Sequence, residues 1–270
     1  MNTLSLHSRK PLRSGNRMPL IGLGTWQLTD HTRDAVAHAL EIGYPMIDTS
    51  GDYGTQAGIG RALRDAGTAR ESIYIITKVE ETDDAYDATR KNLAELAIDF
   101  ADLMLLHRPP EKGVGVDLWQ GLIRARDEGL ARDIGVSNYS VEQIAALAEE
   151  TGEMPAVNQI EWSPFGYGPR MRKYCHEHDI VIQAYSPLTR TERLDDPALV
   201  EIAEHYNKTP AQILIRWNLQ HGVVPLPKAN RQEHLEENLN VFDFRIDVPD
   251  MATLDGLNER YSSLGTLPYD

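Results

Sequence analysis

The stretch IYIITKVEETDDAYDATRKNLAELAIDFADLMLLH, residues 73–107, decides the fold that this sequence predicts. It opens with the apolar, β-branched run 73–79 and closes with a second apolar run, 103–107. Segment 84–96, between the two runs, has apolar residues at helical spacing. Strand, helix and strand in this order predict two parallel strands joined by a right-handed crossover.

The same alternation continues in both directions along the 270 residues. The expected strands are residues 20–24, 44–48, 73–79, 103–107, 134–137, 156–160, 180–185 and 223–226. The expected helices are residues 31–42, 84–96, 118–128, 141–149, 170–177, 197–206, 210–219 and 232–240. Eight strand–helix units in roughly 250 residues favour a closed (β/α)8 TIM barrel over an open, doubly wound sheet.

The ends of the chain and the absence of linkers complete the predicted organisation. Residues 4–19 have turn chemistry at 14–16, so we expect a β-hairpin there that closes the barrel floor. The short tail, 261–270, is marked by Gly and Pro and is not expected to form a further domain. With no Pro/Ser-rich linker or charge block, residues 1–270 are expected to be a single domain.

Composition restricts the compartment and the partners. Asp and Glu outnumber Lys and Arg by 41 to 27, a net charge of −14, which disfavours binding to nucleic acid or anionic membranes. The single cysteine, Cys175, precludes an intrachain disulfide and suits a reducing cytoplasm. Neither a signal peptide in 1–18 nor a run of about 20 apolar residues is evident. We expect a cytoplasmic protein, monomeric by default.

Four side chains stand at or just beyond the ends of expected strands. Asp48, Lys78 and His107 end or follow three successive apolar runs, and Tyr53 follows Asp48 in a Gly-containing loop. The carboxyl ends of parallel strands meet at one rim of a barrel, where catalytic groups gather. A carboxylate, a phenol, an ammonium and an imidazole together are suited to moving a proton. Taken singly, each of these four residues also fits an ordinary structural role, such as a helix cap or a surface lysine.

Glycine-rich and histidine-rich segments are read as structural. GLGTWQ (22–27) and GIGRAL (58–63) both lack the third Gly of the dinucleotide-binding fingerprint. We therefore expect Gly58 and Gly60, which open a helix, to allow close helix packing. His176 and His178 flank Glu177 on a polar helix, which is typical of a solvated face. No metal site is expected.

The order and spacing of many short motifs resemble the aldo-keto reductase superfamily nearly end to end. The matching stretches are GLGTWQ (22–27), IDTSGDYG (47–54), ITKV (76–79), DLMLLHRP (102–109), IGVSNYS (134–140), VNQIEWSPF (157–165), AYSPL (184–188), PAQILIRWNLQ (210–220) and PKANRQEHLEENLNVFDF (227–244). The resemblance, nearest to prokaryotic diketogluconate and aldehyde reductases, implies a (β/α)8 barrel that reduces aldehydes and ketones to alcohols with NADPH, and with NADH also accepted.

The resemblance also assigns residues to roles. The implied catalytic set is Asp48, Tyr53, Lys78 and His107, and Trp26 falls in the substrate pocket. The implied cofactor residues are Thr25; Ser137, Asn138 and Gln159 at the nicotinamide carboxamide; Tyr185, whose ring stacks on the nicotinamide; Ser186 and Leu188; Lys228 at the 2′-phosphate; and Glu237 and Asn238 at the adenine. Arg231 and His234, where this chain departs from the family, are also expected to contact the cofactor.

Carbonyl reduction explains why these residue types are needed. Hydride delivery leaves negative charge on the carbonyl oxygen, which must receive a proton. We expect the Lys78 ammonium to lower the pKa of Tyr53 from its ordinary value near ~10 and so ease proton release. Asp48 would hold Lys78 charged, and His107 would donate a hydrogen bond to the substrate oxygen in the correct tautomer.

The cofactor segment departs from the family pattern. It reads Lys228-Ala229 in place of Lys-Ser, and His234 stands where an Arg is usual. A neutral imidazole offers one donor and no charge, whereas Arg clamps a phosphate with two. Arg231 is placed to compensate for the missing Arg. In the alternative interpretation, His234 points to solvent, and Lys228 and Arg231 hold the 2′-phosphate without it. We expect NADPH to bind, NADH to be tolerated better than usual, and NADPH preference to weaken as pH rises.

Two further departures concern the rim of the pocket. Arg108 follows His107 where relatives often have Trp, so it could attract substrates that carry a carboxylate; a pair with Glu80 that only shapes the rim is favoured slightly. The loop 189–196 reads TRTERLDD in place of the commoner Gly-Ser continuation, which leaves its path over the pyrophosphate open.

Two other functions compete with the reductase. The first is a catalytically weak barrel that serves as a cofactor-sensing binding or regulatory subunit. The second is a different (β/α)8 enzyme that uses Lys78 as a Schiff base. The substrate is the main open point, because pocket loops vary; small carbonyl compounds, sugar-derived ones among them, are expected.

Overall fold

Eight parallel strands form the centre of the molecule. The computed structural model describes residues 4–267 and 269, and within them the strands pair in chain order, from β3 to β10. The strands are β3 (Leu23–Gly24), β4 (Met46–Asp48), β5 (Tyr74–Val79), β6 (Ala101–Leu106), β7 (Ala131–Ser137), β8 (Val157–Glu161), β9 (Val181–Tyr185) and β10 (Val224–Pro225). Backbone hydrogen bonds from Gly22 N to Pro225 O and from Gly24 N to Pro227 O join the first strand to the last. The sheet therefore curls into a barrel.

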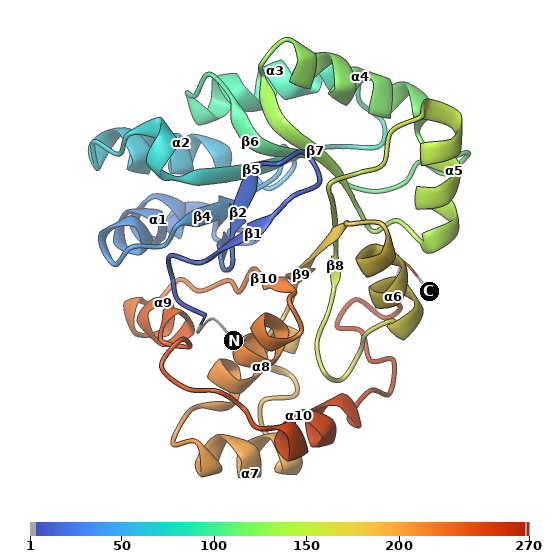
Figure 1. Cartoon of the computed structure of the whole chain (residues 1–270). Coiled ribbons are helices and arrows are strands. Elements are labelled where there is room, and N and C mark those ends of the chain that lie inside the picture. Colours follow the sequence, from blue (N-terminus) through green and yellow to red (C-terminus); the bar gives the residue numbers. More distant parts are fainter. Residues whose placement is uncertain (1–3, 268, 270) are drawn as a thin grey trace.

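Helices surround these strands (Figure 1). They are α1 (Thr32–Glu41), α2 (Gln56–Asp65), α3 (Ala85–Leu96), α4 (Val116–Asp127), α5 (Val141–Thr151), α6 (Pro169–Glu177), α7 (Pro197–His205), α8 (Pro210–Gln220), α9 (Gln232–Leu239) and α10 (Val248–Asp255), with short 3-10 turns η1 (Thr29–His31), η2 (Arg70–Ser72) and η3 (Thr189–Thr191). The predicted (β/α)8 architecture is confirmed, and each expected strand and helix is present with its ends moved by a few residues.

Sequence reasoning gave no bounds for two of the helices. Helix α2 contains GIGRAL, which was expected to open a helix. Helix α10 was not expected, although Asp247 caps it by accepting a hydrogen bond from Asp250 N, and Pro249 lies in its first turn. Those two residues are ordinary signals of a helix start, so α10 was open to prediction.

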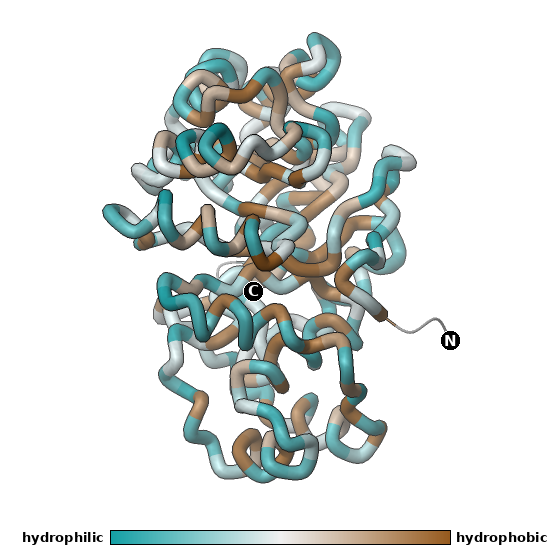
Figure 2. Tube along the Cα trace, turned by 90° about the vertical axis from the view of Figure 1, so that its left-hand side faces the viewer, coloured by the Kyte–Doolittle hydropathy of each residue, from teal (hydrophilic) through white to brown (hydrophobic). Residues whose placement is uncertain are grey.

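The N-terminal hairpin closes one end of the barrel, as predicted. Strands β1 (Arg9–Pro11) and β2 (Arg17–Pro19) pair antiparallel, and the hairpin crosses the strands in Figure 1. Its side chains Leu12 and Met18 are buried in one cluster with strand residues such as Met46 and Leu105. Apolar burial of this kind stabilises by about 25 cal/mol per Å2 removed from water. Hydrophobic segments accordingly run through the middle of the trace in Figure 2.

Close packing of α2 explains the glycines at 58 and 60. A Cβ on Gly58 would lie 2.9 Å from Thr32 Cβ in α1, and one on Gly60 would collide with the carbonyl oxygen of Leu96 in α3. Both glycines are buried. The expectation that they allow helices to approach one another is confirmed.

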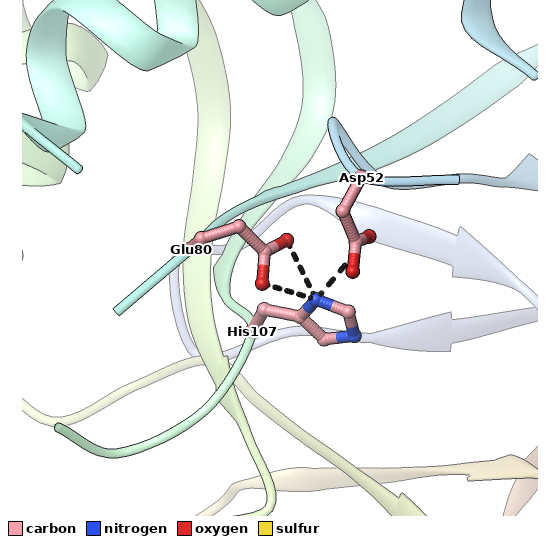
Figure 3. A group of neighbouring side chains, drawn as sticks. All are labelled: Asp52, Glu80 and His107. Atoms are coloured by element: carbon pink, nitrogen blue, oxygen red, sulfur yellow. Dashed lines mark hydrogen bonds and ion pairs between the residues drawn. The ribbon is translucent and has the colours of Figure 1, made fainter. Parts of the chain in front are cut away.

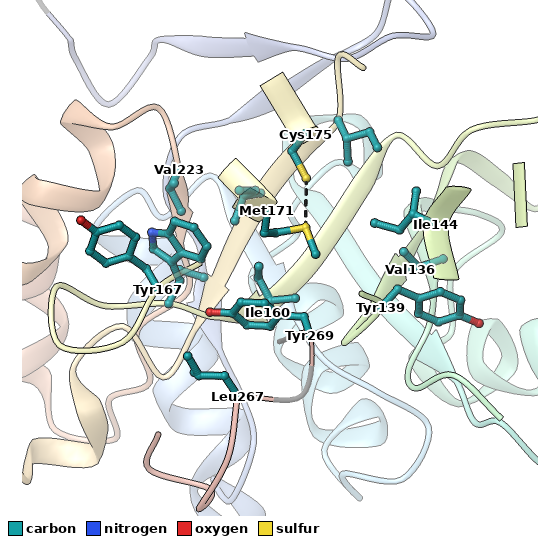
Figure 4. Close-up of a cluster of buried hydrophobic side chains, with 14 of the residues drawn as sticks. Val136, Tyr139, Ile144, Ile160, Tyr167, Met171, Cys175, Val223, Leu267 and Tyr269 are labelled. Atoms are coloured by element: carbon teal, nitrogen blue, oxygen red, sulfur yellow. Dashed lines mark hydrogen bonds between the residues drawn. The ribbon is translucent and has the colours of Figure 1, made fainter. Parts of the chain in front are cut away.

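The C-terminal tail packs on the barrel wall. Leu267 and Tyr269 are buried next to Ile160 of β8 and Met171 of α6, as Figure 4 shows. The Tyr269 hydroxyl donates to the backbone oxygen of Glu161, 2.8 Å away. Among residues 4–267 and 269, no helix combines the length and the apolar character needed to cross a bilayer.

Candidate active site

Asp48, Lys78 and Tyr53 meet at one rim of the barrel. Asp48 ends β4, and Lys78 lies in β5 beside it, so parallel pairing brings the two side chains together. Lys78 Nζ donates to both carboxylate oxygens of Asp48 (2.9 and 3.0 Å) and to the Thr49 backbone oxygen (2.7 Å). It also lies 3.4 Å from the Tyr53 hydroxyl. The ammonium is fully buried, and every donor has a partner.

Neighbouring side chains fix the Asp48 carboxylate. Gln159 Nε2 donates to Asp48 Oδ1 (2.8 Å) and to Gln183 Oε1 (3.1 Å). Thr25 donates its hydroxyl to the backbone oxygen of Asp48 (2.8 Å). A buried ion pair of this kind holds only when its remaining hydrogen-bonding groups are satisfied. Gln159 meets that need for the carboxylate, and Thr25 satisfies the backbone oxygen of the same residue.

The pKa of one of these three residues, Tyr53, differs from the expectation. Burial alone would lower the pKa of Lys78, but the Asp48 carboxylate and Tyr53 raise it above its ordinary value. Burial raises the pKa of Tyr53 above 10, and the opposing effect of the Lys78 ammonium only partly offsets this. The prediction that Lys78 lowers the pKa of Tyr53 was right for the pairwise effect and wrong for the net shift, because desolvation of a phenolate costs more.

His107 is held by a carboxylate. Its Nδ1 lies 2.7 and 3.0 Å from the two oxygens of Glu80 and 3.6 Å from Asp52 Oδ1 (Figure 3). Ser50 donates to the same Glu80 carboxylate at 3.1 Å. On the other side, the His107 ring lies edge-on to Tyr53, with ring centroids 5.7 Å apart. The four expected catalytic side chains therefore come together in one place.

Arg108 is paired with carboxylates on the rim. Its guanidinium lies 3.1 Å from Glu80, 3.5 Å from Glu81 and 3.6 Å from Asp52. The predicted Arg108–Glu80 pair is present, and two further acids share the charge. Ligand atoms of Asp52, Glu80 and His107 all lie within 4.8 Å of one another, close enough to hold a cation, but Arg108 already supplies positive charge to both carboxylates.

A cavity of about 480 Å3 opens over these groups. Of the expected site residues, it is lined by Trp26, Asp48, Tyr53, His107, Arg108, Ser137, Asn138, Gln159, Tyr185, Ser186, Leu188 and Lys228. Lys78 does not line the cavity, and its buried ammonium contacts Asp48 and Tyr53, which do. Also outside the lining are Thr25, Arg231, His234, Glu237 and Asn238.

Hydrogen-bonded polar groups at the end of β7, in β8 and at the end of β9 line one wall of the cavity. Asn138 Nδ2 donates to the His107 backbone oxygen (3.0 Å), and the Tyr185 hydroxyl donates to Asn138 Oδ1 (2.8 Å). The Ser137 hydroxyl donates to the Gln159 backbone oxygen (2.7 Å). Asn138 has a φ of 65°, a conformation that Asn tolerates better than most residues. The amide and the aromatic ring are thus held at fixed positions in the wall.

The loop 189–196 contributes Arg190 and Thr191 to the cavity lining. Arg190 lies over the Trp26 ring, 4.4 Å from its centroid, and both residues line the cavity. Tyr261 donates to Glu192 (2.7 Å), and Arg193 pairs with Glu259. The loop that the sequence left open is therefore attached both to Trp26 in the cavity lining and to the C-terminal tail.

The phosphate corner, formed by the three residues expected to bind the 2′-phosphate (Lys228, Arg231 and His234), is exposed at the surface. Lys228 is exposed, and Arg231 donates to His234 Nε2, 2.7 Å away, in an exposed pair. Glu237 already accepts a hydrogen bond from the Thr209 hydroxyl, and Asn238 is 3% exposed. His234 contacts Arg231 and is exposed to solvent, so both readings of its role stay open.

Sequence reasoning missed some groups near the site. Glu80 was paired with Arg108 but not with His107, and Asp52 and Arg190 were not considered. A usable signal existed for Glu80, because it stands two residues after Lys78 and strand alternation puts both on one face. Nothing in the sequence pointed to Arg190 on Trp26, since that contact joins two irregular loops.

Comparisons with known proteins agree with this geometry. The family model described as "Aldo/keto reductase family" matches residues 20–259. An aldo-keto reductase of Mycobacterium tuberculosis is 43% identical over 254 residues, which cover 92% of this chain and 90% of the relative. One from Mycolicibacterium vanbaalenii is 42% identical over 255 residues, covering 92% and 91%.

Solved structures show the same fold over nearly the whole length. An aldo/keto reductase from Brucella melitensis superposes with a TM-score of 0.88 at 35% identity, covering 93% of this chain and 99% of its own. A Bombyx mori aldo-keto reductase, solved in complex with NADP, gives 0.90 at 29% identity, covering 96% and 95%. On the family match and these relatives, the chain belongs to the aldo/keto reductase family.

Proposed function

We propose that this protein reduces aldehydes and ketones to alcohols with NADPH, and that Tyr53 is the general acid. The observation that carries the proposal is the buried Asp48–Lys78–Tyr53 contact on the floor of a cavity that His107 also lines. Small carbonyl compounds, sugar-derived ones among them, are the proposed substrates. The contacts of Lys78 argue against Schiff-base chemistry, because the amine is fully buried and held by Asp48.

The donor set of the cavity fits a dinucleotide. Ser137, Asn138 and Gln159 offer hydrogen-bonding groups suited to a carboxamide, and the fixed ring of Tyr185 offers a face for stacking. Lys228 lines the same cavity and is exposed, so it can reach a phosphate. NADPH, when bound, supplies the hydride. NADH is the alternative cofactor, and it should be tolerated better than usual because the phosphate corner has His234 in place of the usual Arg.

The chain's own residues handle the proton. Tyr53 donates its hydroxyl proton to the carbonyl oxygen as negative charge develops there, and takes it back in alcohol oxidation. Lys78 stabilises the resulting phenolate, which matters because burial opposes that charge. Asp48 keeps Lys78 protonated. His107 lines the cavity next to Tyr53, where it can orient the carbonyl oxygen.

The remaining proposals concern the cellular compartment, the domain organisation and the oligomeric state. The one free cysteine among the described residues, Cys175, is buried, which suits a reducing cytoplasm. The barrel has its own core, so we propose that residues 1–270 act as a single-domain monomer.

The direct test is NADPH consumption with a simple aromatic aldehyde by the full-length protein. We expect stoichiometric alcohol formation, and a loss of about 10²- to 10⁴-fold in kcat for Tyr53→Phe. The dissociation constant for NADPH should be unchanged in that variant. A Phe variant with near-wild-type turnover would contradict the assignment of Tyr53. Binding of NADPH without turnover on any carbonyl would favour the regulatory-subunit alternative.

A further inference from the structure

A second cavity lies at the end of the barrel that the N-terminal hairpin closes. It has a volume of about 460 Å3 and is lined by hairpin residues 10–13, by side chains of α6, by residues 179–182 and by residues 221–223 after α8. Strand β9 begins at this cavity with Val181 and ends at the active cavity with Tyr185, so the two cavities lie at opposite ends of one strand. We call it the floor cavity; it shares no lining residue with the candidate active site.

The floor cavity combines buried apolar side chains with an excess of positive charge. Its buried apolar lining includes Leu12, Cys175, Ile180 and Val223, and Figure 4 shows Cys175 and Val223 in the adjoining core cluster. Three formal cations, Lys10, Arg13 and Arg172, line it against one carboxylate, Asp179. In a chain with a net charge of −14, this local excess is unusual. Such a lining suits an anion that has an apolar body.

Lys10 brings a cation to the floor cavity without a counter-charge. It is half-buried in β1, and no hydrogen bond or ion pair joins its ammonium to any residue that the structure describes. Burial lowers the pKa of Lys10 from its usual value, and no carboxylate opposes this. A Cβ on Gly222 would lie 3.0 Å from Lys10 Nζ, so the ammonium lies against the backbone just after α8. The carboxyl end of a helix favours a cation only weakly, and here it provides no acceptor for the three N–H donors.

Arg172 is held at the same place by a neutral histidine. Its Nη1 donates to Nδ1 of His221, 2.9 Å away, and Nε2 of that ring donates to Asp255, 2.7 Å away. An Arg can only donate, so Nδ1 is an acceptor and the ring hydrogen is on Nε2. Burial lowers the pKa of His221, and Arg172 adds to this while Asp255 opposes it, which agrees with a neutral ring. No carboxylate in the described part of the chain pairs with Arg172, so its charge, like that of Lys10, is uncompensated beside residues 221–222.

We propose that the floor cavity binds a small phosphate monoester, with Lys10 and Arg172 holding the phosphate and the apolar lining contacting its carbon skeleton. A phosphate monoester carries nearly two negative charges at neutral pH, so it matches two uncompensated cations, whereas a carboxylate would neutralise only one. The guanidinium of Arg172 can donate two N–H groups to neighbouring phosphate oxygens. The site uses none of the residues assigned to carbonyl reduction, so this inference is independent of the proposed function.

Isothermal titration of the full-length protein with phenyl phosphate, in a phosphate-free buffer of low ionic strength, tests the site. We expect one molecule to bind per chain, and inorganic phosphate to bind more weakly because it has no apolar part. Loss of one charged hydrogen-bonding partner should weaken phenyl phosphate binding about 10- to 100-fold in Lys10→Met and in Arg172→Met. No saturable binding, unchanged binding in both variants, or equal affinities for phenyl phosphate and inorganic phosphate would overturn the proposal.

Two control variants locate the bound anion. Arg17→Met removes an exposed cation from the same hairpin but none from the floor cavity, and Lys228→Met removes an exposed cation from the phosphate corner. Both should bind phenyl phosphate like the wild type. A comparable loss in Arg17→Met would show a general effect of net charge, and a comparable loss in Lys228→Met would place the ligand at the phosphate corner. Either result would overturn the proposal.

Urea denaturation separates a ligand-binding cation from a structural one. Lys10 has no described partner to lose, so Lys10→Met should unfold at the same urea concentration as the wild type or at a higher one. Phenyl phosphate should raise the unfolding midpoint of the wild type, because it binds only the folded chain, and should leave that of Lys10→Met nearly unchanged at the same concentration. A midpoint that falls in Lys10→Met without ligand would assign Lys10 a structural role and contradict the proposal.

Discussion

The two ends of the cavity are built in different ways. At the strand ends, Lys78 is fully buried and its ammonium has Asp48, a backbone oxygen and Tyr53 as partners. At the phosphate corner, Lys228 is exposed, and Arg231 meets only the exposed ring of His234 among the contacts described. Charges at the strand ends are coupled to folding, whereas charges at the corner are free to respond to ligand and solvent. Substitutions at the two ends should therefore have separable effects.

The largest effect is expected for Asp48→Asn. Removing one member of a buried ion pair leaves the Lys78 ammonium without its counter-charge, which costs about 3–5 kcal/mol in the free energy of unfolding. Asp48 also raises the pKa of Lys78, so the variant should favour the neutral amine and lose turnover as well. Urea denaturation measures the stability. A change below about 1 kcal/mol would show that the pair is less coupled to folding than its burial implies.

The strand-end region was largely predictable, and the reason is local. Asp48 and Lys78 each end or follow a short apolar run, and parallel pairing of β4 with β5 then brings them together without any long-range information. The net pKa of Tyr53 was not predictable, because it depends on how much solvent the whole pocket excludes. The same holds for Arg190 on Trp26, a contact made by two loops whose paths only the folded chain determines.

Lys228→Met is the matched experiment at the exposed corner. Loss of one hydrogen bond to a charged group is worth about 1.5–3 kcal/mol, so NADPH should bind about 10- to 100-fold more weakly. NADH, which lacks the 2′-phosphate, should bind as before. The free energy of unfolding should change by less than about 0.5 kcal/mol, since Lys228 is exposed. Isothermal titration with both cofactors checks this, and equal losses for NADPH and NADH would remove Lys228 from the phosphate site.

Arg108→Leu tests the rim between the two ends. Because Glu80, Glu81 and Asp52 share the Arg108 charge, little of it is left to attract a substrate carboxylate. We expect kcat/KM for a keto acid and for a neutral aldehyde to fall by similar factors, each under about tenfold. A loss confined to the keto acid would instead restore the idea that Arg108 recognises acidic substrates. Measuring both substrates with one enzyme preparation removes differences in active fraction.

The smallest effect is expected at His234. Its Nε2 accepts a hydrogen bond from Arg231, and a ring that accepts in this way contributes no charge to the corner. A proton added to the ring would supply a cation and remove that acceptor, which should favour the 2′-phosphate as pH falls. An exposed charge is worth at most about 1 kcal/mol, so the ratio of NADH to NADPH dissociation constants should drop no more than about fivefold as pH rises from about 5.5 to 8.

The variant His234→Arg makes that comparison decisive. Arg stays charged throughout this range, so the variant should keep the higher ratio, and hence the stronger NADPH preference, at every pH. If the wild-type ratio does not move with pH, His234 takes no part in cofactor choice, and Lys228 with Arg231 must account for it. The buried strand-end charges would then be the titrating groups that matter for this enzyme, and the corner would act through fixed charges alone.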